Sequence, residues 1–128
     1  MPPEIPADIA SDFREAIRCH WVKAFKATVL MCRKSLQVSC DKENAEGNDL
    51  FKQIDDLAHK GRITESLKKM AHRIRLLGNR GAHDYSDIDD SITEKDANDA
   101  INFMAHYLQH DFERLFPLRD FDQIFSND

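Results

Sequence analysis

Residue types that could carry chemistry gather in one short stretch of this chain, IRLLGNRGAHDY at positions 74–85. The polar side chains that could act there are Arg75, Asn79, Arg80 and His83. Guanidinium groups bind phosphate oxygens through charge-assisted hydrogen bonds, and a neutral imidazole suits a base near neutral pH. The stretch therefore predicts that these four residues contact a phosphate-bearing ligand.

The same stretch also has a purely structural interpretation. Gly78 would end a helix as a C-terminal cap, Asn79 tolerates a left-handed backbone, and His83 would hydrogen-bond loop carbonyls. Because a helix C-terminus carries negative partial charge, the arginines and not the helix dipole would have to attract an anion. Both interpretations stay open on the sequence.

Charge is distributed unevenly along the chain. The formal net charge of −5 argues against a protein that binds nucleic acid with its whole surface. Residues 60–83, however, hold seven basic residues and one acid, whereas residues 84–128 hold three basic residues and twelve acids. The basic stretch predicts nucleic-acid-binding side chains, with an ordinary solvated helix face as the alternative: Lys68, Lys69, Arg73 and Arg80.

Apolar residues recur at three- and four-residue steps in five segments, which predicts five amphipathic helices. The segments run over residues 9–20, 22–40, 50–58, 64–77 and 93–115. Gly61 and Gly78 follow the third and fourth segments in the position of cap glycines, and Pro117 closes the fifth. Five helices with short connections predict an all-α bundle.

The pattern also predicts the domain organisation. Residues 8–116 form the helical domain, residues 1–7 an N-terminal extension and residues 117–128 an acidic C-terminal tail. Residues 79–92 are expected as a loop. Thr93, followed three residues later by Asp96, predicts an acidic variant of the capping box at the start of the fifth helix.

Two pairs on the fifth predicted helix allow more than one interpretation. Phe103 and Tyr107 widen its apolar face, and they would either complete the core or form a homodimer face. His106 and His110 stand four residues apart and could share a metal, but no further ligands complete the set at this spacing, so solvated or interface histidines are the alternative.

Several strong signatures are absent from the sequence. It has no phosphate-binding glycine-rich loop, no H-E-x-x-H motif and no zinc-binding cysteine spacing, so we expect no cofactor and no metal. Cys19, Cys32 and Cys40 are expected as free thiols. No apolar run is long enough to cross a membrane and no leader is evident, which predicts a cytoplasmic protein.

Three segments together resemble the bacterial family named domain of unknown function 4145, which looks like a branch of the HEPN (higher eukaryotes and prokaryotes nucleotide-binding) superfamily. They are DFREAIRCHWVKAFKATVLMCRKSLQ, LFKQIDDLAHKGRITESLKKMAHRIRLLGNRGAH and ITEKDANDAINFMAHYL. The resemblance implies a HEPN-like up-and-down bundle of four or five helices, frequent homodimers, and an association with bacterial defence and restriction systems.

The resemblance also implies roles for residues of the quoted stretch. Many HEPN proteins are metal-independent RNases that use an arginine, an adjacent polar residue and a histidine after three more residues. Asn79 matches the polar residue and His83 the histidine, which would act as base on the ribose 2′-hydroxyl. The arginine position falls on Gly78, so Arg75 or Arg80 would supply the guanidinium.

Three functions follow from the sequence. The first is a non-catalytic helical interaction module, dimeric or docking a protein partner. The second is a metal-independent endoribonuclease that uses Arg75, Asn79, Arg80 and His83. The third is a domain that binds a nucleotide or RNA without cutting it. The acidic total and the missing arginine favour the first.

Overall fold

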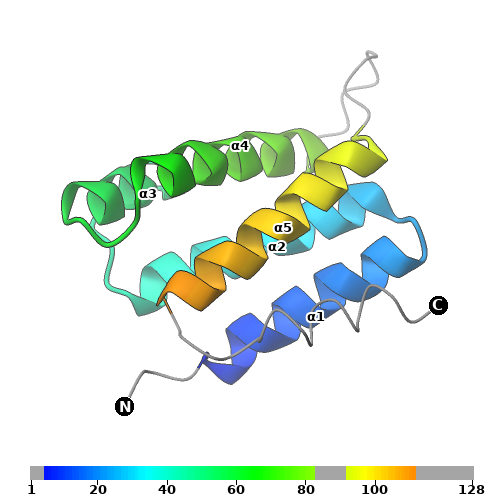
Figure 1. Ribbon diagram of the computed structural model, residues 1–128, viewed down its shortest axis with the longest axis horizontal. Helices are drawn as coiled ribbons and strands as arrows, with labels where there is room; N and C mark the ends of the chain where they lie inside the picture. The colour runs from blue at the N-terminus through cyan, green and yellow to red at the C-terminus, as the bar shows by residue number, and fades with distance from the viewer. Residues whose placement is uncertain (1–4, 83–91, 112–128) are drawn as a thin grey trace.

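The structure, a computed structural model, describes residues 5–82 and 92–111, and the side chains of residues 5–78 and 92–109. Over these residues the chain is all-helical, with five helices and no strand, as the periodicity predicted (Figure 1). The helices are α1 (Ala7–Trp21), α2 (Phe25–Lys42), α3 (Leu50–His59), α4 (Glu65–Ala82) and α5 (Glu94–Asp111). No helix in this part of the chain has the length and apolar character to cross a membrane.

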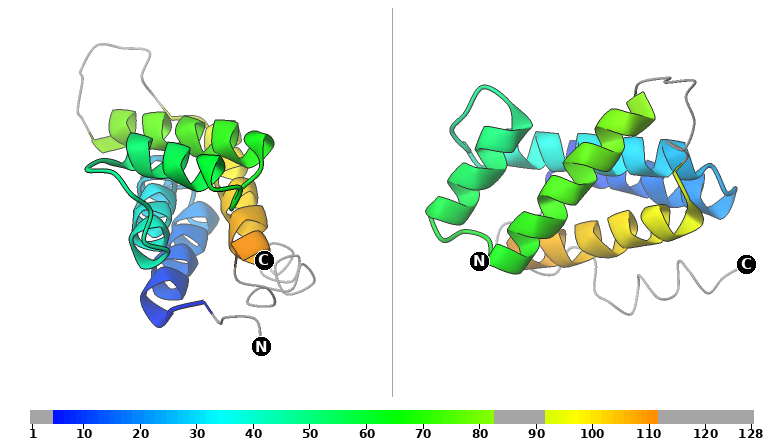
Figure 2. Two further views of the ribbon diagram at one scale, coloured as in Figure 1. Left: turned by 90° about the vertical axis from the view of Figure 1, so that its left-hand side faces the viewer. Right: turned by 90° about the horizontal axis from the view of Figure 1, so that it is seen from above.

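Helix α2 occupies the centre of the molecule. It contacts each of the four other helices, and its contact with α1 is the most extensive. Helices α3 and α4 lie on one side of α2 and α1 lies on the other, while α5 runs beside α2 (Figures 1 and 2). Because α4 is packed against α2, α3 and α5 together, side chains on different faces of α4 meet different neighbours.

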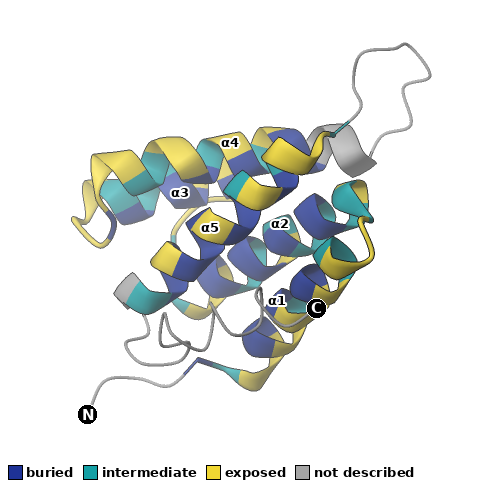
Figure 3. Cartoon of the chain, turned by 45° about the vertical axis from the view of Figure 1, so that its right-hand side comes forward, coloured by how far each residue is buried: buried dark blue, intermediate teal, exposed yellow. Residues whose placement is uncertain are grey.

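The core forms where the apolar faces of the five helices meet (Figure 3). The largest of its side chains are less than 2% exposed: Tyr107, Phe13, Phe103, Ile9, Leu36, Ile54, Leu57, Ile74, Ile101, Met104, Leu108 and Val29. Full burial of such a side chain is worth about 2 kcal/mol in transfer free energy. None of the three cysteines, all within the described residues, is in a disulfide; Cys32 and Cys40 are buried and Cys19 is half-buried.

Phe103 and Tyr107 belong to this core and not to an exposed dimer face, because both are fully buried within the single chain. The Tyr107 hydroxyl accepts a hydrogen bond from Ser39 at 3.0 Å and donates one to Glu43 at 2.9 Å. These bonds satisfy a polar group that would be expensive to bury alone. The wide apolar face of α5 therefore completes the fold.

Helix α5 starts at the predicted capping box. The Thr93 amide donates to the Asp96 carboxylate at 3.1 Å, and the Asp96 amide donates to the Thr93 hydroxyl at 3.2 Å. Helix α3 has a simpler cap, in which the Asp49 carboxylate accepts the Lys52 amide at 2.8 Å. Gly61 follows α3 with a positive φ of 73°, which agrees with its predicted role at the end of that helix.

The prediction that Gly78 ends the fourth helix is wrong. Helix α4 continues through Gly78 and Gly81 to Ala82, so the first four residues of the expected loop are helical. Gly78 is buried against α2, where an added Cβ would lie 2.8 Å from Cβ of Arg33 and closer still to its Cδ. The glycine therefore allows two helices to approach closely. Residues 83–91, which include His83, lie outside the described residues.

Candidate functional site

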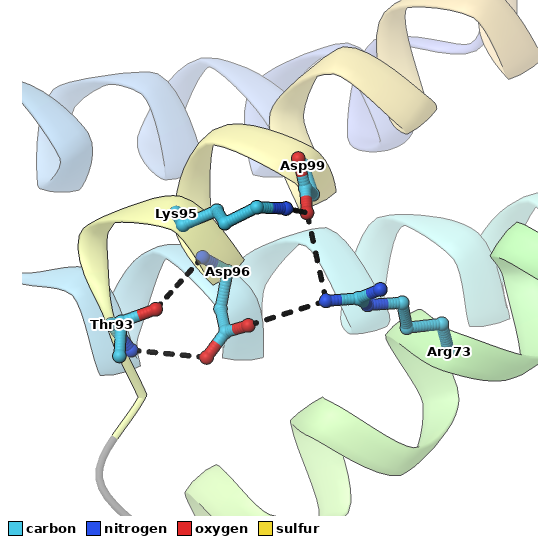
Figure 4. A network of polar contacts seen from close by, with 5 residues as sticks. All are labelled: Arg73, Thr93, Lys95, Asp96 and Asp99. Carbon is cyan, nitrogen blue, oxygen red and sulfur yellow. Dashed lines mark hydrogen bonds and ion pairs between the residues drawn. The ribbon is translucent and has the colours of Figure 1, made fainter.

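The basic residues of α4 are divided between two sides of the helix. Arg73 points to α5, where its guanidinium lies 3.6 Å from the carboxylates of both Asp96 and Asp99 (Figure 4). Lys95 also contacts Asp99, at 2.9 Å. The charge of Arg73 is thus already balanced by the acidic start of α5.

The opposite side of α4 faces α3. Lys68 lies 3.7 Å from the Asp55 carboxylate, whereas Lys69 is exposed and makes no ion pair with the described residues. Arg80 lies within α4, but its side chain is outside the described part. The predicted nucleic-acid-binding set therefore does not form one continuous face, because Lys68 and Arg73 contact different helices.

Arg75 has a different environment from Arg73. Its side chain is half-buried, and its guanidinium lies 5.1 Å from the centre of the Phe51 ring on α3. Its Nε donates to Nδ1 of His72 at 3.3 Å. Arg75 makes no ion pair with a carboxylate among the residues described. A ring face and a neutral acceptor hold this cation in place without cancelling its charge.

His72 connects Arg75 to an acid on α3. Its Nε2 lies 2.8 Å from Oδ1 of Asp55, and its ring packs at 4.9 Å from that of Phe51. Because the Nε of Arg75 can only donate, Nδ1 of His72 must accept, which places the imidazole proton on Nε2, facing Asp55. Asp55 therefore selects the tautomer of His72 that can hold Arg75.

A second arginine, which no pattern in the sequence singles out, lies beside this cluster. Arg33 of α2 lines an open pocket of about 220 Å³ together with Arg75 and the first turn of α3, namely Asp49, Leu50 and Phe51. Burial lowers the pKa of Arg33, and the positive charge of Arg75 lowers it further. Nothing in the sequence links residues 33 and 75, since only the packing of α2 on α4 brings them together.

The predicted catalytic set is only partly visible. Arg75 and Asn79 lie four residues apart in α4, and Arg80 follows in the same helix. His83 lies beyond the described residues, and nothing is described of the side chains of Asn79 and Arg80. The joint role of these four residues stays a prediction.

The histidines of α5 show no metal set within the described residues. His106 is exposed, and its Nδ1 lies 2.7 Å from the Asn102 carbonyl oxygen one turn earlier. The side chain of His110 is outside the described part. Among the described residues, no three His, Cys, Asp or Glu side chains form a group that could hold a metal ion.

Comparison with known proteins places most of the chain in one family. A family model with the description "Domain of unknown function (DUF4145)" matches residues 14–120, a range that spans part of α1 and all of α2 to α5. No curated protein and no solved structure matches the chain. Arg33, Phe51, His72 and Arg75 all fall inside the matched range.

Proposed function

The chain belongs to the family of domain of unknown function DUF4145, and we propose that it is a helical interaction module that binds RNA or a nucleotide without cutting it. The observation that supports this proposal is the state of Arg75. Its cation is oriented by Phe51 and His72 but has no carboxylate partner among the described residues. A phosphate would supply the missing negative charge.

Arginine suits this role because its planar guanidinium group can donate two parallel hydrogen bonds to a phosphate. Part of the conformational entropy that a long side chain loses on binding has already been lost in Arg75, since two neighbours hold it. The exposed Phe51 ring beside it offers a surface for an unpaired base, and 47% of that residue is exposed.

The test compares two arginines of the same helix. A short fluorescein-labelled single-stranded RNA is titrated with the protein at low ionic strength, and the anisotropy is followed for the wild type, Arg75→Met and Arg73→Met. We expect Arg75→Met to weaken binding about ten-fold, since a hydrogen bond to a charged group contributes roughly 1.5–3 kcal/mol. Arg73→Met removes the same charge and should change the affinity less than about two-fold, because acids of α5 already balance it.

Wild-type affinity must also fall as salt rises, because binding releases counterions from the phosphates. Equal affinities for the wild type and Arg75→Met, with both proteins folded, would refute the proposed RNA site. A comparable loss in both variants would instead indicate attraction by net charge and would refute the specific role of Arg75.

A second candidate function, metal-independent RNA cleavage, is favoured by one observation. Helix α4 continues without a break from Arg75 past Asn79 to Ala82, so these residues stay in one helical frame up to the residue before His83. In this hypothesis His83 is the base, and Arg75 and Arg80 stabilise charge on the phosphate. RNA decay without metal that disappears in His83→Ala would support cleavage, and equal background decay in both proteins would eliminate it.

The remaining elements of the proposal rest on the sequence, partly on its resemblance to the HEPN superfamily and partly on its residue pattern. They are a HEPN-like up-and-down arrangement of the domain at residues 8–116, a homodimer, a cytoplasmic location, and service in bacterial defence or nucleic-acid processing beside a protein partner. Light scattering after size-exclusion chromatography tests the homodimer, and a strictly monomeric mass at micromolar concentration would exclude it.

A further inference from the structure

The pocket between α2, α3 and α4 is lined by two positively charged side chains. Two arginines from different helices line it, and neither makes an ion pair with a carboxylate in the described part of the chain. Like charges repel at short range, and the repulsion is strongest where burial limits screening by water. The fold therefore keeps two cations together at a cost that an anion would remove.

Arg33 is held in this position by the packing of its own side chain. Its aliphatic part lies against Gly78, where no Cβ could be accommodated without movement. Its Nε is buried and has no hydrogen-bond partner among the described residues. A buried donor without an acceptor is unfavourable, so this atom marks a place where an acceptor is missing.

The start of α3 borders the same pocket. Leu50 and Phe51 are the first two residues of this ten-residue helix, and both line the pocket. Amides at these positions have no acceptor within the helix, and the positive end of the helix dipole lies there. Asp49 also lines the pocket, and its carboxylate, which accepts the Lys52 amide, opposes an anion and limits its affinity.

We propose that the pocket formed by Arg33, Arg75 and the first turn of α3 is a binding site for one phosphate group. The volume of about 220 Å³ is several times the ~30 Å³ that a water molecule occupies in the liquid, so a phosphate fits with part of the group that it is attached to. The inference extends the proposed function, because the phosphate would belong to a mononucleotide or to an RNA backbone. In this site Arg33 supplies the second positive charge that binds the phosphate, beside that of Arg75.

The experiment uses inorganic phosphate as the probe. Proton–nitrogen correlation NMR at low ionic strength follows the backbone amides during the titration, and a thermal melt reports the midpoint at each phosphate concentration. We expect the largest shifts at the Leu50 and Phe51 amides and a midpoint that rises with phosphate, as mass action requires. Shifts that are scattered over exposed lysines, with none at these two amides, would overturn the site.

Two variants and a matched control sharpen the test. Arg33→Met keeps the aliphatic stem on Gly78 but removes the charge, and it should weaken phosphate binding about ten-fold or more. It should also raise the midpoint of the ligand-free protein, because it removes the repulsion from Arg75 and the buried Nε. Asp49→Asn preserves the helix cap and should strengthen binding a few-fold.

Lys26→Met, at an exposed position of the same helix, is the matched control and should change phosphate affinity less than about two-fold. Wild-type phosphate affinity in Arg33→Met, or no gain in Asp49→Asn, would refute the pocket. Titrations with adenosine monophosphate and with an RNA that lacks terminal phosphates distinguish a mononucleotide phosphate from a backbone phosphate. Binding of each is measured by the same amide shifts at Leu50 and Phe51. RNA binding that requires Arg75 but not Arg33 would refute the pocket and leave the proposed function intact.

Discussion

Arg73 and Arg75 lie two residues apart on α4 and differ in almost every physical respect. A two-residue step turns an α-helix by about 200°, so the two side chains leave it on nearly opposite sides. Arg73 meets two carboxylates of α5. Arg75 contacts the Phe51 ring of α3 and the His72 imidazole of its own helix, and it lines a pocket together with a second arginine, Arg33.

The comparison shows that two basic residues of one helix can differ in whether acids balance them, and that the sequence alone does not distinguish the two cases. The ion pairs of Arg73 connect α4 to the capped start of α5, where they balance the acids Asp96 and Asp99. The contacts of Arg75 restrain its position but leave its charge uncompensated among the described residues. A ligand is therefore expected on the α3 side of α4 and not on the α5 side.

The largest loss of stability is expected when a side chain is added at Gly78, where α4 packs closely against α2. Gly78→Val places a branched side chain against Arg33, which overpacks the crossing, and should lower the free energy of unfolding by about 2 kcal/mol in urea titrations. It should also displace Arg33 and weaken phosphate binding. Shortening Arg33 relieves part of the clash, so Gly78→Val combined with Arg33→Ala should lose less stability than the sum of the two single variants. Strict additivity would contradict the role of Gly78 as a contact glycine.

A smaller loss of stability is expected from changes on the α5 side of α4, at Asp96. Desolvation is the largest influence on Asp96 and acts to raise its pKa, but hydrogen bonds from Thr93 and the charge of Arg73 outweigh it and hold the pKa below the ordinary aspartate value. A lowered folded-state pKa stabilises the protein above the ordinary aspartate range, and this contribution is lost as the pH falls through the lowered value.

Asp96→Ala should therefore lower stability by about 1 kcal/mol near neutral pH and flatten the loss of stability in acid. Chemical unfolding over a pH series measures both. Asp99→Ala is the control, since it removes a contact of Arg73 but not the cap, and it should have the smaller effect. RNA binding should stay unchanged in both variants, and a loss of affinity there would break the distinction between the two sides of α4.

The smallest change in RNA affinity is expected from changes to His72, which connects Asp55 to Arg75. His72→Leu removes the acceptor that Arg75 uses, and it should weaken RNA binding by about three-fold, because a neutral hydrogen bond contributes roughly 0.5–1.5 kcal/mol. His72→Asn can place its amide oxygen near the position of Nδ1 and should recover part of the affinity. Anisotropy titrations measure both variants. An equal loss in the two would mean that the ring and not the acceptor positions Arg75.

Much of the fold could be predicted because it depends on local pattern. The spacing of Phe13, Val29, Ile54 and Ile101 predicted buried helix faces, and each of these residues is buried. The Thr93 and Asp96 cap was also predictable, since both partners lie within one turn. Gly78 was misread for the same local reason, because a glycine near the end of an apolar pattern has the signature of a cap, whereas its requirement comes from Arg33 on another helix.

The sequence by itself determined the helical class, the apolar faces and the presence of a basic stretch, because these properties depend on residues within a few turns of one another. Only the tertiary structure decided which cations are neutralised. Arg73 is balanced by α5, Lys68 by Asp55, and Arg75 is joined by Arg33, forty-two positions earlier in the chain. Electrostatic interactions depend on distance in space and on exposure to water, and neither follows from the order of residues along the chain.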